Sequence, residues 1–268
     1  MSAVAGRRAA PRRPLRWTFT DAAAVTRRNL YRYIRVPTLL LFSTIQPVMF
    51  VLLFTYVFGG AIQVPGVDNY VDYLMAGILA QTVIFGSTQT GVGLAEDMSR
   101  GMIDRFRSLP MARSAVLAGR TLSDTVRNLF VVILMLMVGT LVGFRFHAGV
   151  VPAIGAVALA LAFGLAFSWI SAFIGLSVRD VESAQAAGFV WVFPLVFASS
   201  AFVPVESMPG WLQAFARINP VTITVNALRA LTLGGPITKP LLQSLAWIAG
   251  ILLVFVPLAV NRYRRAAG

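Results

Sequence analysis

Few of the residue types on which enzyme chemistry depends occur in this chain. It has no cysteine, one histidine, His147, and one lysine, Lys239. A P-loop needs a lysine directly after its glycines to reach the phosphates, but Lys239 is followed by Pro240 with no such loop before it. A Ser-His-Asp hydrolase would need His147, which lies in a predicted short external loop beside Arg145. One histidine without cysteine provides too few ligands for a His/Cys metal site. We therefore predict no enzyme activity, no metal and no cofactor on this chain.

The acidic residues do not form a shared catalytic site either. Glu96 and Asp97 are adjacent in sequence, and neighbouring residues of a helix point in different directions, which does not suit an acid/base pair. Asp124 has Arg120 and Arg127 one turn away on either side, and either arginine could pair with it. We favour a structural role for Asp124, with a proton relay as the alternative.

Composition places most of the chain in lipid. Of the 268 residues, 57% are hydrophobic and 12% are charged, with a mean hydropathy of +0.77. A soluble domain carries about 25% charged residues and has too small an interior for this much apolar surface. The N-terminus is basic but has no early apolar segment, so we expect no cleavable signal peptide. We predict an all-α membrane protein.

The net charge of +13 is arranged as a topology signal. Nine of the 23 basic residues precede Pro37, six lie within 100–127, and three lie within 262–265. Because Lys and Arg are retained on the cytoplasmic side, we expect both termini to be cytoplasmic in a bacterial inner membrane. This orientation puts 19 of the 23 basic residues inside, including Arg179. We expect contact with anionic lipid and no binding of nucleic acid. The residues left outside are Arg145, Arg217, Arg229 and Lys239.

Six segments are long and apolar enough to cross the membrane, since a spanning helix needs roughly 20 apolar residues. The third has the shortest uncharged core, and Arg120, Asp124 and Arg127 lie in its first turns. A charge at mid-bilayer costs at least about 2.5–3.5 kcal/mol, so we expect these three near the cytoplasmic interface. The predicted spans are about 39–58, 70–94, 121–143, 150–177, 184–203 and 241–260.

The remaining segments complete a single six-helix domain over 37–262. We expect a disordered basic tail at 1–16 and a cytoplasmic tail at 263–268. Residues 17–36 are predicted to form an amphipathic interfacial helix, which either anchors in lipid or also touches a cytoplasmic partner. Its apolar face would comprise Phe19, Ala22, Ala23, Thr26, Leu30, Tyr33 and Ile34.

The segment between the fifth and sixth spans is apolar but broken by prolines and glycines. Its two helical pieces, about 210–217 and 221–233, are too short to span, so we predict two external re-entrant helices. The residues that mark this re-entrant segment are Pro204, Pro209, Trp211, Asn219 and Pro220.

Polar and aromatic residues within two spans suggest a substrate path. Polar groups in lipid normally face protein or water, and phenylalanines at every fourth position share one helix face. A path between subunits is one interpretation; helix–helix hydrogen bonds and lipid-facing or dimer-facing rings are the other. The residues are Gln81, Phe85, Thr88 and Gln89 in the second span and Phe189, Phe193 and Phe197 in the fifth.

The loop between the second and third spans has an apolar side and a charged side, and Pro110 ends its short helix. Such a projection either docks in a groove of another protein or packs on the membrane surface. The interface residues would be Glu96, Asp97, Arg100, Gly101, Met102, Asp104, Arg105, Phe106, Arg107, Leu109 and Pro110.

Two blocks of residues resemble the type-2 ATP-binding-cassette exporter permeases, most closely the daunorubicin/doxorubicin-resistance group. The first is Glu-Asp-x-x-x-Gly-x-x-x-Arg-Phe-Arg-Ser-Leu-Pro at 96–110, followed by Gly119-Arg120. The second runs from Phe202-Val203-Pro204 through Met-Pro-Gly-Trp-Leu at 208–212 and Asn-Pro-Val-Thr at 219–222 to Ala-Leu-Arg-Ala-Leu at 227–231. The blocks follow the family's order, and the resemblance covers about residues 20–262.

The resemblance implies the transmembrane subunit of an ATP-driven exporter of drug-like, amphipathic or lipid-type molecules. It implies a dimer, expected to be a homodimer, on two copies of a cytoplasmic ABC ATPase that holds the ATP and Mg. In this family the 96–110 loop carries the coupling helix. An ATP-independent secondary transporter or channel is the alternative, although no inverted repeat is visible.

Overall fold

A computed structural model describes residues 15–35, 37–60, 69–102 and 113–266. Every regular element within these ranges is helical, and they contain no strand. The elements are α1 (Leu15–Arg35), α2 (Pro37–Leu53), a π-helical turn η1 (Phe54–Phe58), α3 (Tyr70–Ser99), α5 (Arg113–Val142), α6 (Val150–Gly175), α7 (Val181–Phe197), a 3₁₀ turn η2 (Val205–Ser207), α8 (Gly210–Ile218), α9 (Pro220–Leu233) and α10 (Thr238–Ala266).

Four of these helices are long and apolar enough to cross a membrane. They are α3, α5, α6 and α10, and each overlaps one of the predicted spans. The other two predicted spans coincide with shorter apolar helices, α2 continued by η1, and α7. The all-helical class and the helix positions expected from the sequence are therefore present.

The fifth predicted span, 184–203, is too long at its C-terminal end. Helix α7 ends at Phe197, and the chain then turns away because side chains of the turn and of α9 bond its backbone. Ser200 N donates to Thr222 Oγ1 at 3.1 Å, and Ala201 N donates to Ser199 Oγ at 3.2 Å. These bonds replace the helical ones that the N–H groups of Ser200 and Ala201 would otherwise have made.

Helix α7 begins at a side-chain cap. Asp180 Oδ1 accepts the Ser183 N–H at 2.7 Å, and its other oxygen accepts the Ser183 hydroxyl at 2.9 Å. These bonds, the backbone one foremost, hold the pKa of Asp180 below its ordinary value. The cap fixes the start of α7 directly after the turn from α6.

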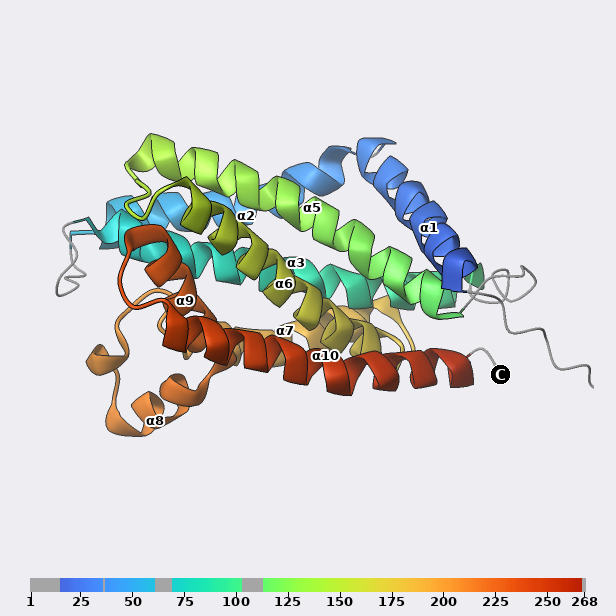
Figure 1. Cartoon of the computed structure of the whole chain (residues 1–268). Helices are drawn as coiled ribbons and strands as arrows, with labels where there is room; N and C mark the ends of the chain where they lie inside the picture. Colours follow the sequence, from blue (N-terminus) through green and yellow to red (C-terminus); the bar gives the residue numbers. More distant parts are fainter. Residues whose placement is uncertain (1–14, 36, 61–68, 103–112, 267–268) are drawn as a thin grey trace, which may run out of the picture.

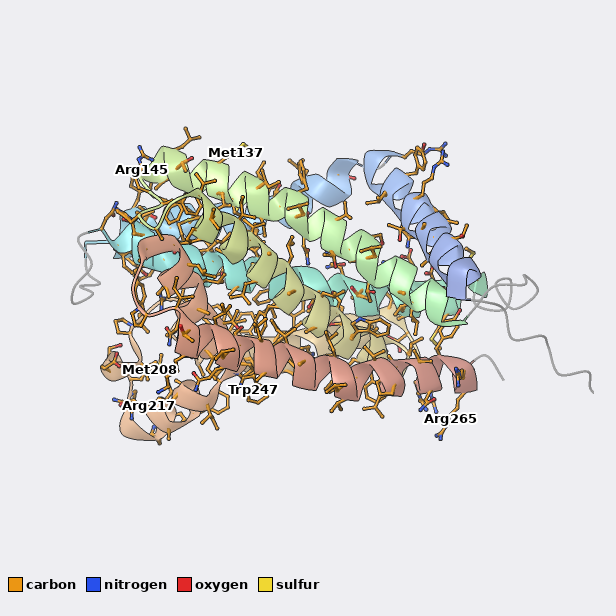
Figure 2. The ribbon with its side chains drawn as sticks, viewed as in Figure 1. Met137, Arg145, Met208, Arg217, Trp247 and Arg265 are labelled. Atoms are coloured by element: carbon orange, nitrogen blue, oxygen red, sulfur yellow. The ribbon has the colours of Figure 1, made fainter. Side chains whose placement is uncertain are left out.

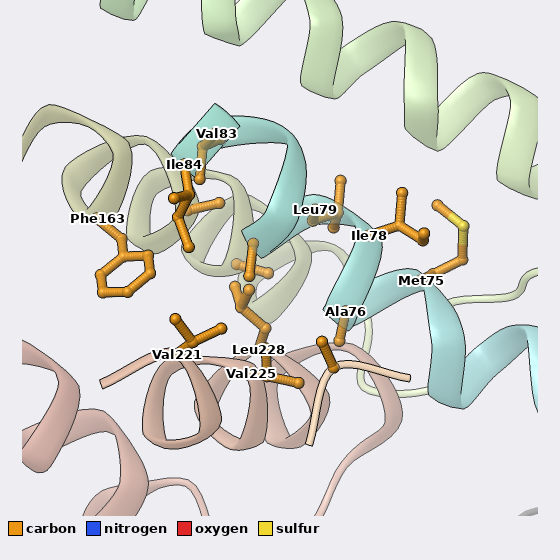
Figure 3. Packing of buried hydrophobic residues seen from close by; sticks show 14 of the residues in the cluster. Met75, Ala76, Ile78, Leu79, Val83, Ile84, Phe163, Val221, Val225 and Leu228 are labelled. Carbon is orange, nitrogen blue, oxygen red and sulfur yellow. The ribbon is translucent and has the colours of Figure 1, made fainter. Parts of the chain in front are cut away.

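Helix α3 is the centre of the bundle. It packs against α5, α6, α7 and α9, and most of its apolar length is buried. Figure 3 shows its side chains facing Phe163 of α6 on one side and Val221 and Leu228 of α9 on another. Gly91 of α3 and Gly175 of α6 bring the two backbones together, because a Cβ on Gly175 would lie 2.6 Å from Gly91 Cα.

The two ends of the bundle carry different elements. Helix α1, the end of α3, the start of α5 and the C-terminal end of α10 lie at one end, and α8 and α9 lie at the other (Figure 1). Figure 2 shows Arg265 at the first end and Arg145 and Arg217 at the opposite one. Arg265, which the sequence assigns to the inside, thus lies at the opposite end of the protein from Arg145 and Arg217, which it assigns to the outside.

Helix α1 begins two residues before the predicted interfacial helix and packs one face against α5. On this face Val25, Thr26 and Asn29 are buried, and Thr26 Oγ1 lies 2.8 Å from the carbonyl oxygen of Ala22 and 3.1 Å from that of Gly119. Ala23 of the predicted lipid face is exposed, and contact of that face with the membrane stays a prediction. The side chains of Phe19, Tyr33 and Ile34, which the sequence placed on the apolar face, lie outside the described part.

Helices α5 and α10 present apolar side chains outward. Met137 on α5 and Trp247 on α10 project away from the bundle in Figure 2. On α5 the exposed apolar residues recur at helical spacing, which is typical of a lipid-facing stripe. They are Leu122, Val126, Phe130, Ile133, Met137 and Leu141.

Candidate functional site

A buried network of charged side chains joins α3 to α5. Asp124 is fully buried, and its Oδ2 accepts the Thr90 hydroxyl at 2.7 Å and Arg120 Nε at 3.4 Å. Arg120 Nη1 also lies 3.7 Å from Asp97 Oδ2, close to the end of α3. The pairing of Asp124 with Arg120 agrees with one of the two sequence-based expectations. Both residues are enclosed between helices. Their position near the cytoplasmic interface of the membrane stays a prediction.

Arg127 is a second buried cation, one turn further along α5. Its Nη2 donates to the carbonyl oxygen of Gly86 and, at 3.2 Å, to Asn128 Oδ1. Asn128 Nδ2 in turn donates to the carbonyl oxygen of Val83 at 3.4 Å. Glycines leave the room for these side chains, because a Cβ on Gly86 would overlap Asn128 and one on Gly93 would overlap Arg120.

A cavity of about 390 Å³ opens beside this network, between α1, α2, α3 and α5. Its volume lies in the range of about 300–1,000 Å³ that is typical of small-molecule sites. Ten of its sixteen lining residues have polar or charged side chains. The neutral polar side chains are Asn29, Ser43, Gln46, Gln81, Thr82, Gln89 and Asn128; the charged ones are Glu96, Arg120 and Arg127; and the apolar ones include Pro47, Phe85, Val92 and Val131.

Three of the four predicted path residues of α3 line this cavity: Gln81, Phe85 and Gln89. Thr88 does not. Its hydroxyl donates to the carbonyl oxygen of Phe85 at 2.7 Å, and its methyl group faces Gly188 of α7, where a Cβ would lie 3.5 Å away. Position 88 lies about 20° from position 81 around the helix, at the edge of the shared face and on the side that packs against α7.

The phenylalanines form a continuous row that begins at the cavity. The Phe85 ring lies 5.8 Å from that of Phe189 and 5.9 Å from that of Phe193. Phe193 stacks on Phe197 at 4.6 Å, and Phe197 stacks on Phe202 at 5.4 Å. The predicted residues of α3 and α7 are thus brought together. Phe50 of α2 and Phe54 of η1 extend the row, with Phe54 stacked on Phe202 at 4.5 Å.

Only the first part of the predicted coupling loop is described. Glu96 Oε1 pairs with Arg100 Nη2 at 2.7 Å and Asp97 pairs with Arg120, so the adjacent carboxylates bind different partners. Gly101 has a φ of +66°, a left-handed conformation that favours glycine, and Met102 follows it. The rest of the loop lies outside the described residues. The predicted residues concerned are Asp104, Arg105, Phe106, Arg107, Leu109 and Pro110.

The segment after α7 has the helices expected from the sequence, α8 and α9. Pro209 directly precedes α8, and Trp211 is exposed on it. Asn219 accepts the Val221 N–H at 2.8 Å to cap α9, and its Nδ2 donates to the carbonyls of Leu195 and Ala198. Pro220 occupies the first turn of α9, and Pro204 directly precedes η2.

Arg229 of α9 fastens the turn after α7 to the start of α3. Its guanidinium carbon lies 3.4 Å from the centre of the Tyr73 ring. It donates to the carbonyl oxygens of Ser200, Ala201 and Tyr73, and the Tyr73 hydroxyl donates to Ser200 O at 3.1 Å. Nothing in the sequence pattern singled out this role, because the partners are 28 to 156 residues away.

The exchange Arg229→Met is expected to reduce the free energy of unfolding by about 3 kcal/mol, because buried carbonyls lose their donor. The midpoint of thermal unfolding in lipid nanodiscs measures this loss. Arg217→Met is the matched control, since Arg217 is exposed on α8 and bonds only Gln213 among the described residues. An equal midpoint for the two variants would contradict the assigned role.

Several cavity residues were not anticipated from the sequence. Asn29 comes from α1, Ser43 and Gln46 come from α2, and Asn128 comes from α5. The available signal was the presence of amide side chains within apolar segments, which normally face protein or water. The periodicity of a single sequence does not show which helices surround these side chains.

Comparison with known proteins identifies the class to which this fold and site belong. The ABC-2 type transporter family matches residues 20–233, most of the chain. The chain belongs to this family and is a membrane-embedded transmembrane subunit of an ABC transporter. Membership of this family implies association with an ABC ATPase subunit.

Particular relatives are permeases associated with drug resistance. The chain is 34% identical over 256 residues to the daunorubicin resistance ABC transporter permease protein DrrB1 of Streptomyces coeruleorubidus, covering 94% of this chain and 89% of that protein. It is 30% identical over 243 residues to the probable doxorubicin resistance ABC transporter permease protein DrrC of Mycobacterium tuberculosis, covering 90% and 87%. It is 26% identical over 204 residues to the putative transport permease ycf38 of Cyanophora paradoxa, covering 74% and 69%.

Proposed function

We propose that this chain is the permease subunit of an ATP-driven exporter of amphipathic, drug-like or lipid-type molecules. It works as a homodimer on two copies of a separate ATPase, which binds the ATP and Mg. It crosses the inner membrane of a bacterium six times, with both termini in the cytoplasm and with α8 and α9 re-entering from outside. The names of the drug-resistance permeases support the substrate class.

One observation carries the proposal: the charged network connects the coupling-loop end of the bundle to the cavity. Asp97 and Arg100 lie at the end of α3, directly before the loop, and Arg120 links Asp97 to Asp124 deeper in α5. Arg120 and Glu96 also line the cavity. A force applied to the loop therefore reaches the cavity wall through a few buried contacts.

The aromatic row supplies the outward part of the path. It leads from Phe85 at the cavity to Phe202 near the end that carries α8 and α9, and Phe189, Phe193 and Phe197 remain partly exposed on the bundle surface. A flat apolar molecule can pass along such rings, and a second copy of the chain would enclose the exposed side. Polar parts of the cargo would begin in the cavity.

Coupling is tested with the exchange Phe106→Pro in the complex with its ATPase, reconstituted in proteoliposomes. Shifting the permease between two conformations, from a ratio of 1:99 to 99:1, takes about 5.5 kcal/mol. We expect the ATPase to supply this free energy through the coupling loop. Exported drug per ATP hydrolysed should fall about 5- to 150-fold, the range that 1–3 kcal/mol of coupling between sites gives, while the complex still assembles.

The control is Phe130→Leu on the lipid-facing stripe of α5. Proline is not used at this position because it would break the helix. Phe130→Leu should leave the ratio of drug to ATP unchanged. A ratio unaffected by Phe106→Pro overturns the coupling proposal. Transport by the chain alone down an ion gradient would favour a secondary transporter instead.

A further inference from the structure

The cavity wall contains buried polar atoms without a partner among the described residues. They are Asn29 Nδ2, Gln81 Oε1 and Thr82 Oγ1, and each belongs to a side chain that is at least nine-tenths buried. All three residues line the same cavity, from α1 and α3. Because a buried polar group costs free energy unless it is hydrogen-bonded, their convergence on one cavity indicates a bound polar group.

The charges around the cavity favour an uncharged group. The charged lining residues are Glu96, Arg120 and Arg127. Arg100 pairs with Glu96, and Asp97 and Asp124 pair with Arg120, so the lining residues and their ion-pair partners together carry no net charge. An anion or a cation would leave one sign in excess in this partly enclosed space, where charges interact strongly. A neutral hydrogen-bonding group disturbs none of the ion pairs.

The hydrogen-bonding chemistry of the three unpartnered atoms further restricts the chemical class of the bound group. An amide N–H donates, a carbonyl oxygen accepts, and a threonine hydroxyl does both. Hydroxyl groups on a ligand can serve all three, because each hydroxyl both donates and accepts. Phe85 adds one aromatic ring to the wall and connects the cavity to the aromatic row.

We propose that this cavity, within a single subunit, binds the uncharged, hydroxyl-rich headgroup of an amphipathic molecule, such as one sugar ring. The apolar part of the same molecule lies against Phe85 and the aromatic row. This inference rests on the proposed export function for its biological meaning, although the binding itself needs no ATPase. The headgroup belongs either to a membrane glycolipid or to a small glycoside.

The test uses the absence of cysteine from the chain. The exchange Gln89→Cys places a unique thiol at the open side of the cavity, and Ser177→Cys places one on the exposed surface just after α6. The rate of maleimide labelling is measured in phosphatidylcholine and phosphatidylglycerol nanodiscs free of glycoside detergent. The probes are octyl glucoside, octyl sulfate and octyltrimethylammonium, all below their micellar concentrations.

Octyl glucoside should slow labelling at position 89 and leave position 177 unaffected, whereas the two charged probes should protect far less. Adding Gln81→Leu, or the nearly isosteric Thr82→Val, should raise the glucoside concentration needed for protection about tenfold, because one hydrogen-bonding partner is lost. Equal protection by a charged probe, or protection unchanged in both variants, overturns the proposal.

Two further probes distinguish the sources of the headgroup. Phenyl glucoside in solution represents a small glycoside, and a glucosyl diacylglycerol in the nanodisc represents a lipid. Protection by either supports the site and assigns the source; protection by neither overturns it. The labelling assay uses the isolated chain, so its result does not depend on whether ATP hydrolysis is coupled to export. If export is coupled to ATP but octyl glucoside gives no protection, the headgroup site is refuted and the proposed function stands.

Discussion

Replacing Asp124 by leucine is expected to lower the free energy of unfolding by about 3–5 kcal/mol, because it breaks a buried ion pair from one side. Asp124 is fully buried and accepts from both Arg120 and Thr90. Its loss removes the 3.4 Å contact of the Arg120 guanidinium with Asp124, while Asp97 stays 3.7 Å from that guanidinium. The loss should appear in equilibrium unfolding by sodium dodecyl sulfate, followed by tryptophan fluorescence.

The double exchange Asp124→Leu with Arg120→Met is the matched control. Removing both charges replaces the pair by apolar side chains of similar size, which is often neutral or stabilising. We expect the double variant to be more stable than Asp124→Leu alone. If the single variant retains the stability of the parent chain, the network does not hold α3 to α5 in the way described.

The exchange Gly175→Ala is expected to destabilise the α3–α6 contact by about 3 kcal/mol, since overpacking a close contact shifts backbones. The added Cβ would lie 2.6 Å from Gly91 Cα and would overlap the Gly91 carbonyl oxygen. The overlap cannot be avoided by a side-chain movement at Gly91, because the overlapping group is the backbone carbonyl of Gly91. Thermal unfolding in nanodiscs measures the effect.

Gly250→Ala provides the same chemical change where there is space. Gly250 lies within α10, and no atom is within 4 Å of a Cβ at this position. Alanine should stabilise α10 there by about 0.5–1 kcal/mol, because glycine loses more conformational freedom in a helix. Equal unfolding midpoints for the two variants would refute the close packing of α3 on α6.

The positions of the helices were largely predictable because the signal is local. Apolar runs marked α3, α5, α6 and α10, while Pro209, Asn219 and Pro220 marked the boundaries of α8 and α9. The end of α7 was not predictable. It depends on the hydroxyl of Thr222 and the guanidinium of Arg229, which bond residues of the turn from a distant helix.

The candidate site was predicted only in part, for the same physical reason. Gln81, Phe85 and Gln89 share a helix face, and this could be read from their spacing. The burial of Arg120 and Arg127 could not be predicted. A charge near the end of an apolar segment can lie at the membrane interface or between helices. Here Thr90, Gly86 and Gly93 on the neighbouring helix make the enclosed position favourable.

The contact between α1 and α5 has a consequence for biosynthesis. The hydroxyl of Thr26 meets the carbonyl of Gly119, which is added 93 residues later. At translation rates of about 5–20 residues per second, α1 leaves the ribosome about 5–20 s before its packing partner exists. During that interval the nascent helix must wait elsewhere, and its arginines suit it to the anionic surface of the membrane. The N-terminal helix, although first in the sequence, therefore reaches its final place only after α3 and the start of α5 have been made.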